Sequence, residues 1–103
     1  MNLNKLMKQA QKMQEQMART QAELEEKTVE VSAGGDKVTV VANGAGEVLS
    51  IKIAKEIVDP EDVEILEDLI LSGVQQAIAQ GKELANSEMN KITGGMGLEG
   101  LGL

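Results

Sequence analysis

The chain has 103 residues, the size of one small domain, and a formal net charge of −7. It contains no His, Cys, Trp, Tyr or Phe. These absences exclude catalytic triads, thiolate nucleophiles, ordinary zinc sites and the base-stacking platforms of RNA-recognition modules.

In residues 3–26, side chains that are apolar except for Thr20 recur at alternating spacings of three and four, which predicts one amphipathic helix. Asn2 is placed to cap its start. At about 1.5 Å per residue the helix is about 36 Å long, longer than strands of about 17–20 Å. We therefore expect one end to pack on the domain and the rest to project, free or paired with a second copy. The seam of this helix consists of Leu3, Leu6, Ala10, Met13, Met17, Thr20 and Leu24.

The pattern then changes to a period of two, which predicts three strands near residues 28–32, 37–41 and 47–53. Short turns at residues 34–36 and 43–46 join them, so the expected sheet is an antiparallel meander. The third strand places Leu49, Ile51 and Ile53 on one face. Neither edge of the sheet is obviously blocked by proline.

A second helix is predicted from Asp59 as N-cap and Pro60 as first helical residue to about residue 90. A column of small residues (Gly73, Ala77, Gly81 and Ala85) recurs every four positions, and each helical glycine costs about 0.8–1 kcal/mol relative to alanine. We expect a tight approach to a neighbouring element there. Residues 1–93 then form a single α+β domain, followed by a flexible glycine-rich tail at 94–103.

The candidate binding site is the basic face of the first helix. Lys5, Lys8, Lys12 and Arg19 share one side of it, so residues 1–22 have a balance of +3 while the rest of the chain has −10. Such a stripe can follow phosphates with little sequence information. Lysines on a solvated helix face are also ordinary, so the pattern alone leaves both interpretations open.

Other chemistry is weakly supported. The acidic residues at the start of the second helix are explained by the helix dipole, and no loop there supplies the oxygen ligands that calcium needs. The Gly44-x-Gly46 turn is followed by a strand, whereas a dinucleotide-binding loop is followed by a helix. We expect no catalytic residue, cofactor, metal or small-molecule substrate. The alternative function is a dimeric adaptor or chaperone-like module that binds a partner protein through the seam.

The longest unbroken apolar runs have three residues, and no secretory signal is visible. No membrane association is therefore expected, and the predicted location is the cytoplasm. The absence of cysteine is consistent with a reducing compartment.

The chain resembles the YbaB/EbfC family of bacterial nucleoid-associated DNA-binding proteins. The resemblance is carried by residues 6–14 (LMKQAQKMQ), residues 43–48 (NGAGEV) with Ile51 and Ile53, residues 59–62 (DPED), residues 66–70 (LEDLI) and the Gly- and Met-containing end. It covers nearly the whole chain. Many relatives differ at residues 72–76 (SGVQQ), and a proline is common where this chain has Glu99.

The resemblance implies a homodimer with joined sheets and long helices that project like the arms of tweezers. It also implies binding to double-stranded DNA, altered DNA conformation, a location in the nucleoid and an effect on gene expression. Transferred by position, the DNA contacts are Lys5, Lys8 and Lys12, with Arg19 beyond them. Lys37, Lys82 and Lys91 are weaker candidates.

Overall fold

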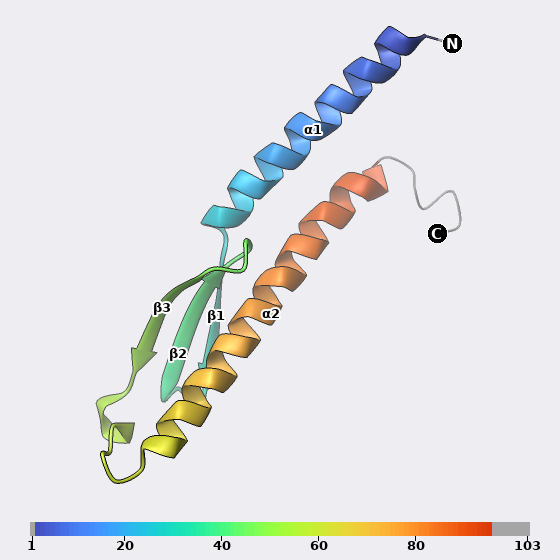
Figure 1. Ribbon diagram of the computed structural model, residues 1–103. Coiled ribbons are helices and arrows are strands. Elements are labelled where there is room, and N and C mark those ends of the chain that lie inside the picture. Colours follow the sequence, from blue (N-terminus) through green and yellow to red (C-terminus); the bar gives the residue numbers. More distant parts are fainter. Residues whose placement is uncertain (1, 96–103) are drawn as a thin grey trace.

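The computed structural model describes residues 2–95, which form a helix, three strands and a second helix (Figure 1). This confirms the predicted α+β class and element order. The elements are α1 (Leu3–Glu26), β1 (Thr28–Ala33), β2 (Val38–Asn43), β3 (Val48–Ile53), the 3-10 helix η1 (Lys55–Ile57) and α2 (Val63–Gly95). The last element includes the first two residues of the predicted tail, and the rest of that tail, 96–103, lies outside the described residues.

Helix α1 begins and ends where the sequence predicts. The Asn2 side chain accepts a hydrogen bond from the backbone N–H of Lys5 at 3.2 Å, so the predicted N-cap is confirmed. The helix contains no glycine or proline, and Thr20 is its one β-branched residue. Its sequence therefore favours the helix without help from tertiary packing.

The three strands form the predicted antiparallel meander in the order β1-β2-β3. Val31 pairs with Val40 and Ala33 pairs with Val38, and all four side chains are buried. Helix α2 packs across β1 and β2 on this face (Figure 1). The core is thus a thin layer between one helix and two strands.

The predicted column of small residues lies where α2 approaches the sheet. A Cβ added at Gly73 would lie 2.9 Å from Cγ2 of Val40, and one added at Gly81 would collide with the carbonyl oxygen of Asn43. Ala77, between them, is fully buried. The expected tight approach is confirmed, and it explains why this helix carries glycines that lower its intrinsic stability.

The predicted start of α2 is wrong, because the helix begins at Val63. Residues 59–62 form a turn in which Asp62 N–H donates to Asp59 O at 2.9 Å, while Glu61 N–H donates to Asp59 Oδ1 at 3.0 Å. Asp and Pro suit the first two positions of a turn as well as the start of a helix. At the other end, the helix passes the predicted stop near residue 90 and continues to Gly95.

Strand β3 is exposed along its whole length. Ile51 and Ile53 pair with the buried Val40 and Val38 and so share the face that α2 covers elsewhere, yet they are 42% and 37% exposed. A bulge leaves Leu49 without a partner in β2 and puts Val48 opposite Ala42. The regular alternation that was expected to place Leu49 beside Ile51 and Ile53 is therefore interrupted at Leu49. The apolar face of the sheet therefore continues beyond the part that α2 covers.

The molecule is elongated, with extents of 72 × 27 × 16 Å and a radius of gyration of 19.7 Å. A compact chain of this length has a radius of gyration of about 13 Å. Val38 and Val40 are the largest fully buried side chains among the described residues. So small a core is typical of a domain that gains stability from another subunit.

Candidate nucleic-acid interface

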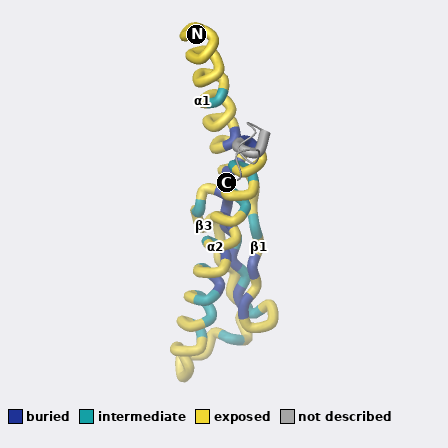
Figure 2. Tube along the Cα trace, turned by 90° about the vertical axis from the view of Figure 1, so that its right-hand side faces the viewer, coloured by how far each residue is buried: buried dark blue, intermediate teal, exposed yellow. Residues whose placement is uncertain are grey.

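Helix α1 projects from the body of the molecule, as the sequence predicts (Figure 2). Of its residues only Thr20 and Leu24, near its C-terminal end, are buried, and Met13 is partly buried. The remainder is exposed to solvent. This projecting part of α1, residues 3–19, is called the arm below.

The four predicted site residues lie exposed on one side of the arm. At about 100° per residue, Lys5, Lys8, Lys12 and Arg19 fall within about 60° of one another and about 140° from the seam. In the part of the chain that the structure describes, none of the four forms an ion pair. Their positive charges are therefore available to an external anion.

Distance separates most of this stripe from the acidic body. Lys5 lies 15 residues before Thr20, the first buried residue, which is about 22 Å along the helix. Lys12 is about 12 Å away by the same measure. Both distances exceed the Debye length of about 8 Å at physiological ionic strength, so salt screens the arm from the body. The net charge of −7 consequently does not decide what the arm attracts.

The other candidate lysines differ from those on the arm. Lys37 Nζ lies 3.0 Å from Glu56 Oε2, and Lys91 Nζ lies 3.5 Å from Glu88 Oε1. Both are thus partly neutralised. Lys82 lines a pocket on the body near the base of the arm.

The base of the arm is fixed by Asn43, a buried residue at the end of β2. Its Oδ1 accepts from Ala45 and Glu47 N–H at 3.0 Å each, and its Nδ2 donates to the Glu25 carbonyl at 3.2 Å. The adjacent Gly44 N–H donates to Leu24 O at 2.9 Å. One turn thus binds the last residues of α1 to the sheet.

A second link joins the base of the arm to α2. Lys27 Nζ lies 3.0 Å from Glu88 Oε1, and the hydrogen bond from Lys27 lowers the pKa of the Glu88 carboxyl below its ordinary value of 4.5. Lys91 adds a smaller effect in the same direction, and partial desolvation opposes both. The carboxylate is therefore ionised at neutral pH and holds both lysines.

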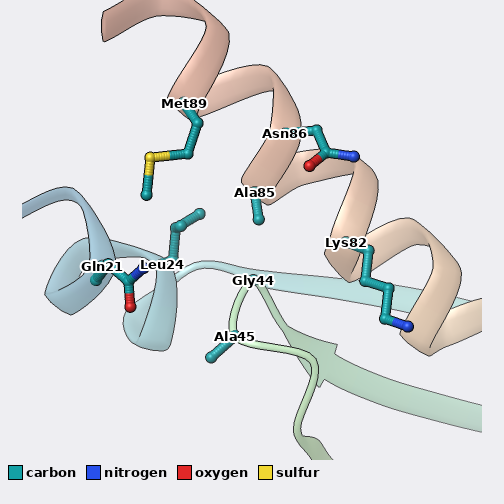
Figure 3. A pocket seen from close by; sticks show the side chains of 8 residues that line it. All are labelled: Gln21, Leu24, Gly44, Ala45, Lys82, Ala85, Asn86 and Met89. Atoms are coloured by element: carbon teal, nitrogen blue, oxygen red, sulfur yellow. The ribbon is translucent and has the colours of Figure 1, made fainter. Parts of the chain in front are cut away.

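An open pocket of about 400 Å³ lies at this junction, between α1, the β2–β3 turn and α2 (Figure 3). Leu24, Ala85 and Met89 point toward one another across it, whereas Lys82 and Asn86 extend along its edge (Figure 3). Its lining combines these apolar side chains with the polar side chains of Gln21, Lys82 and Asn86. We interpret it as a loosely packed joint between the arm and the body.

Sequence reasoning did not identify the residues that hold the arm. The sequence predicts Asn43 only as part of a hairpin turn, because its contacts with α1 depend on the folded chain. The Lys27–Glu88 pair joins residues that are 61 positions apart, which no local pattern can indicate. Among the described residues there is no cluster of metal-binding side chains and no helix suited to crossing a bilayer.

Comparison with known proteins relates this architecture to a family. The model of the YbaB/EbfC DNA-binding family matches residues 1–96. A nucleoid-associated protein of Ruminiclostridium cellulolyticum is 58% identical over 96 residues, which cover 93% of this chain and 84% of that protein. One of Alkaliphilus metalliredigens is 55% identical over 100 residues, which cover 97% and 88% of the two chains.

A solved structure has the same fold. The crystal structure of an uncharacterised protein from Helicobacter pylori superposes with a TM-score of 0.64 at 19% identity, over 76% of this chain and 90% of that one. Together, the match over almost the full length and the sequence identity above one half show to which family this chain belongs. The chain belongs to the YbaB/EbfC DNA-binding family, whose curated relatives are nucleoid-associated proteins.

Proposed function

We propose that this protein binds double-stranded DNA as a homodimer in the nucleoid of the cytoplasm, and that it alters the conformation of the DNA it binds. The contacts are Lys5, Lys8, Lys12 and Arg19 on the arm of each copy. The observation that carries the proposal is the exposed row of four unpaired cations on a projecting helix. Family membership supports DNA as the ligand.

The arm suits phosphates better than base edges. Four cations spread over residues 5–19 cover about 21 Å of helix, and only Lys5 lies in the first turn, the part of a recognition helix that contacts base edges. Contacts of this kind position a protein on a duplex but carry little sequence information. We therefore expect weak sequence preference.

The homodimer is supported by the exposed apolar face of the sheet. Val48, Ile51 and Ile53 are between 37% and 42% exposed, beside a buried cluster of valine and alanine side chains. A contiguous exposed apolar patch commonly marks an interface between proteins. A second copy that covers β3 would also double the number of arms, and with it the number of phosphate contacts.

The decisive experiment is charge reversal on the arm. The double variant Lys8→Glu, Lys12→Glu is expected to bind a duplex about tenfold or more weakly, because each dimer loses four phosphate contacts. The slope of log K against log salt should fall in magnitude by about 3 to 4. Fluorescence anisotropy of labelled DNA at several salt concentrations measures both quantities.

The matched control places the same charge change on the body. In Lys52→Glu, Lys55→Glu two exposed lysines are reversed, one in η1 and one on the face of β3 opposite to Ile51 and Ile53, so the net charge is identical to that of the arm variant. Its affinity should stay within about threefold of the parent, as expected for charges that make no phosphate contact. Equal weakening in both variants would assign binding to net charge and contradict the role of the arm.

The homodimer has its own test. Light scattering should give twice the chain mass of 11.0 kDa for the parent and the charge variants. Ile51→Lys, which places a charge on the exposed face of β3, should shift the mass toward that of one chain. A mass of one chain for the parent would contradict the proposal.

The exposed seam supports one second candidate function, an adaptor or chaperone-like module that binds a helix of another protein. Leu3, Leu6 and Met17 on the seam are 67%, 50% and 40% exposed. If the protein is an adaptor, Met13→Asp should abolish binding of the partner protein. The protein should then bind DNA only weakly, with a small dependence on salt. For the DNA-binding proposal, the same substitution should leave the phosphate contacts intact.

A further inference from the structure

The seam of α1 is covered at one end only. Leu24 is 3% exposed at the end where α1 contacts α2, Met13 farther along is partly buried, and Leu6 and Leu3 near the N-terminus are 50% and 67% exposed. These side chains follow the same helical spacing and therefore lie on the same side of α1. The contact with α2 thus covers the first part of a stripe that continues along the arm.

The chain itself supplies the next segment beside this stripe. Helices α1 and α2 lie side by side in opposite directions, and α1 extends past the end of α2 (Figure 1). Ile92, in the last turn of α2, is 8% exposed. Residues 96–103 therefore start from Gly95, next to the point where the covered part of the seam ends.

Length and composition fit this position. Eight residues reach at most about 26–29 Å, and the seam from Met17 to Leu3 is about 21 Å long. Half of the eight are apolar (Met96, Leu98, Leu101 and Leu103), and the one charged side chain, Glu99, is opposite in sign to the arm.

We propose that residues 96–103 dock on the seam of α1 in the same chain. Their apolar side chains cover Leu6, Ala10 and Met13. The seam and the cationic stripe are on different sides of α1, so docking leaves the proposed DNA contacts free. The inference does not depend on the proposed function, because its test contains no DNA.

Disulfide trapping tests the docking, and the absence of native cysteine makes each introduced pair unambiguous. The first variant carries Ala10→Cys on the seam with Leu101→Cys. The matched control carries Lys8→Cys with Leu101→Cys, two residues away along the chain and about 160° round the helix. Both are oxidised at micromolar concentration, and intrachain and interchain products are separated on a non-reducing gel.

Docking predicts an intrachain disulfide that forms about tenfold faster at Ala10 than at Lys8, since an undocked tether samples both sides of the helix at similar effective concentration. Adding Leu98→Ser and Leu103→Ser to the Ala10 variant should reduce that preference. Equal rates at the two positions would overturn the proposal. A predominantly interchain product would also overturn it and assign the seam to a second copy. Circular dichroism confirms that all variants retain the helices.

Discussion

The two long helices of this molecule are stabilised in different ways. Helix α1 has 24 residues, mostly strong helix formers, and only Thr20 and Leu24 are buried. Helix α2 has 33 residues, includes several β-branched residues and four glycines, and lies against β1 and β2. Local preference therefore accounts for the first helix, whereas tertiary packing accounts for the second.

Because they are stabilised differently, the two helices suit different roles. A helix that needs no packing can extend into solvent and present charge on one side, but it adds little to the stability of the core. A helix with small residues can approach a sheet closely, but it depends on that sheet. Reciprocal substitutions in the two helices test this division, and the predictions below run from the largest expected effect to the smallest.

Gly81→Ala should destabilise the whole domain. The added methyl group meets the Asn43 carbonyl, which is backbone and cannot rotate away. Although alanine favours a helix by about 1 kcal/mol, overpacking of this kind costs about 1–3 kcal/mol, and we expect a net loss. Thermal unfolding followed at 222 nm should show a fall of about 4–8 °C for each kcal/mol lost.

Gln80→Ala, at the neighbouring exposed position, is the control and should leave the unfolding midpoint nearly unchanged. An unchanged midpoint for Gly81→Ala would mean that α2 does not lie as close to the sheet as the structure places it.

Ala18→Gly is the reciprocal change on the arm. It should cost about 1 kcal/mol of local helix stability and leave the midpoint of the body almost unaffected, because residue 18 is exposed on the arm. Hydrogen exchange should show lower protection in residues 3–19 and unchanged protection in β2. A similar loss of protection in both regions would show that the arm and the body unfold together.

Glu15→Gln should strengthen DNA binding by a small factor. Glu15 is the single acid of the arm, three residues from Lys12 and four from Arg19. Glu15 forms no ion pair with either cation in the described structure, so its neutralisation removes a like charge that repels phosphate, and we expect roughly a twofold gain in affinity. Gln16→Glu, the opposite change at the next residue, should weaken binding by a similar factor. Titration of a labelled duplex measures both.

Glu88→Gln should have the smallest effect and a characteristic pH dependence. The hydrogen bond from Lys27 lowers the pKa of Glu88 below 4.5 in the folded chain, so the ion pair contributes to stability above that pH. The contribution is lost as the pH falls through the lowered pKa. The parent and the variant should therefore differ slightly in unfolding midpoint at pH 7 and converge in acid, whereas a constant difference would point to packing.

The parts of the fold that depend on neighbouring residues in sequence could be predicted. The bounds of α1 and its Asn2 cap follow from side-chain spacing and helix propensity. The side of the arm that carries Lys5, Lys8, Lys12 and Arg19 follows from the same spacing. Their exposure agrees with that prediction, and their contact with DNA stays a proposal.

The parts that depend on distant residues could not be predicted. Alternation in β3 defines an apolar face but not the element that covers it, and α2 leaves that face exposed. The sequence Asp59-Pro60 suits a turn and a helix start equally, so the start of α2 was misplaced. The role of Asn43 at the base of the arm appears only when the β2–β3 turn meets the end of α1.

The anchoring of α1 at one end makes it a lever. Its contacts with the body are concentrated at the C-terminal turns, next to the pocket between Leu24 and Met89. A rotation of about 10° at this pivot moves the far tip of a rod about 30 Å long by about 5 Å. On the proposed function, small adjustments at the pivot would let the arms of a dimer fit duplexes of different width and curvature without deforming the sheet.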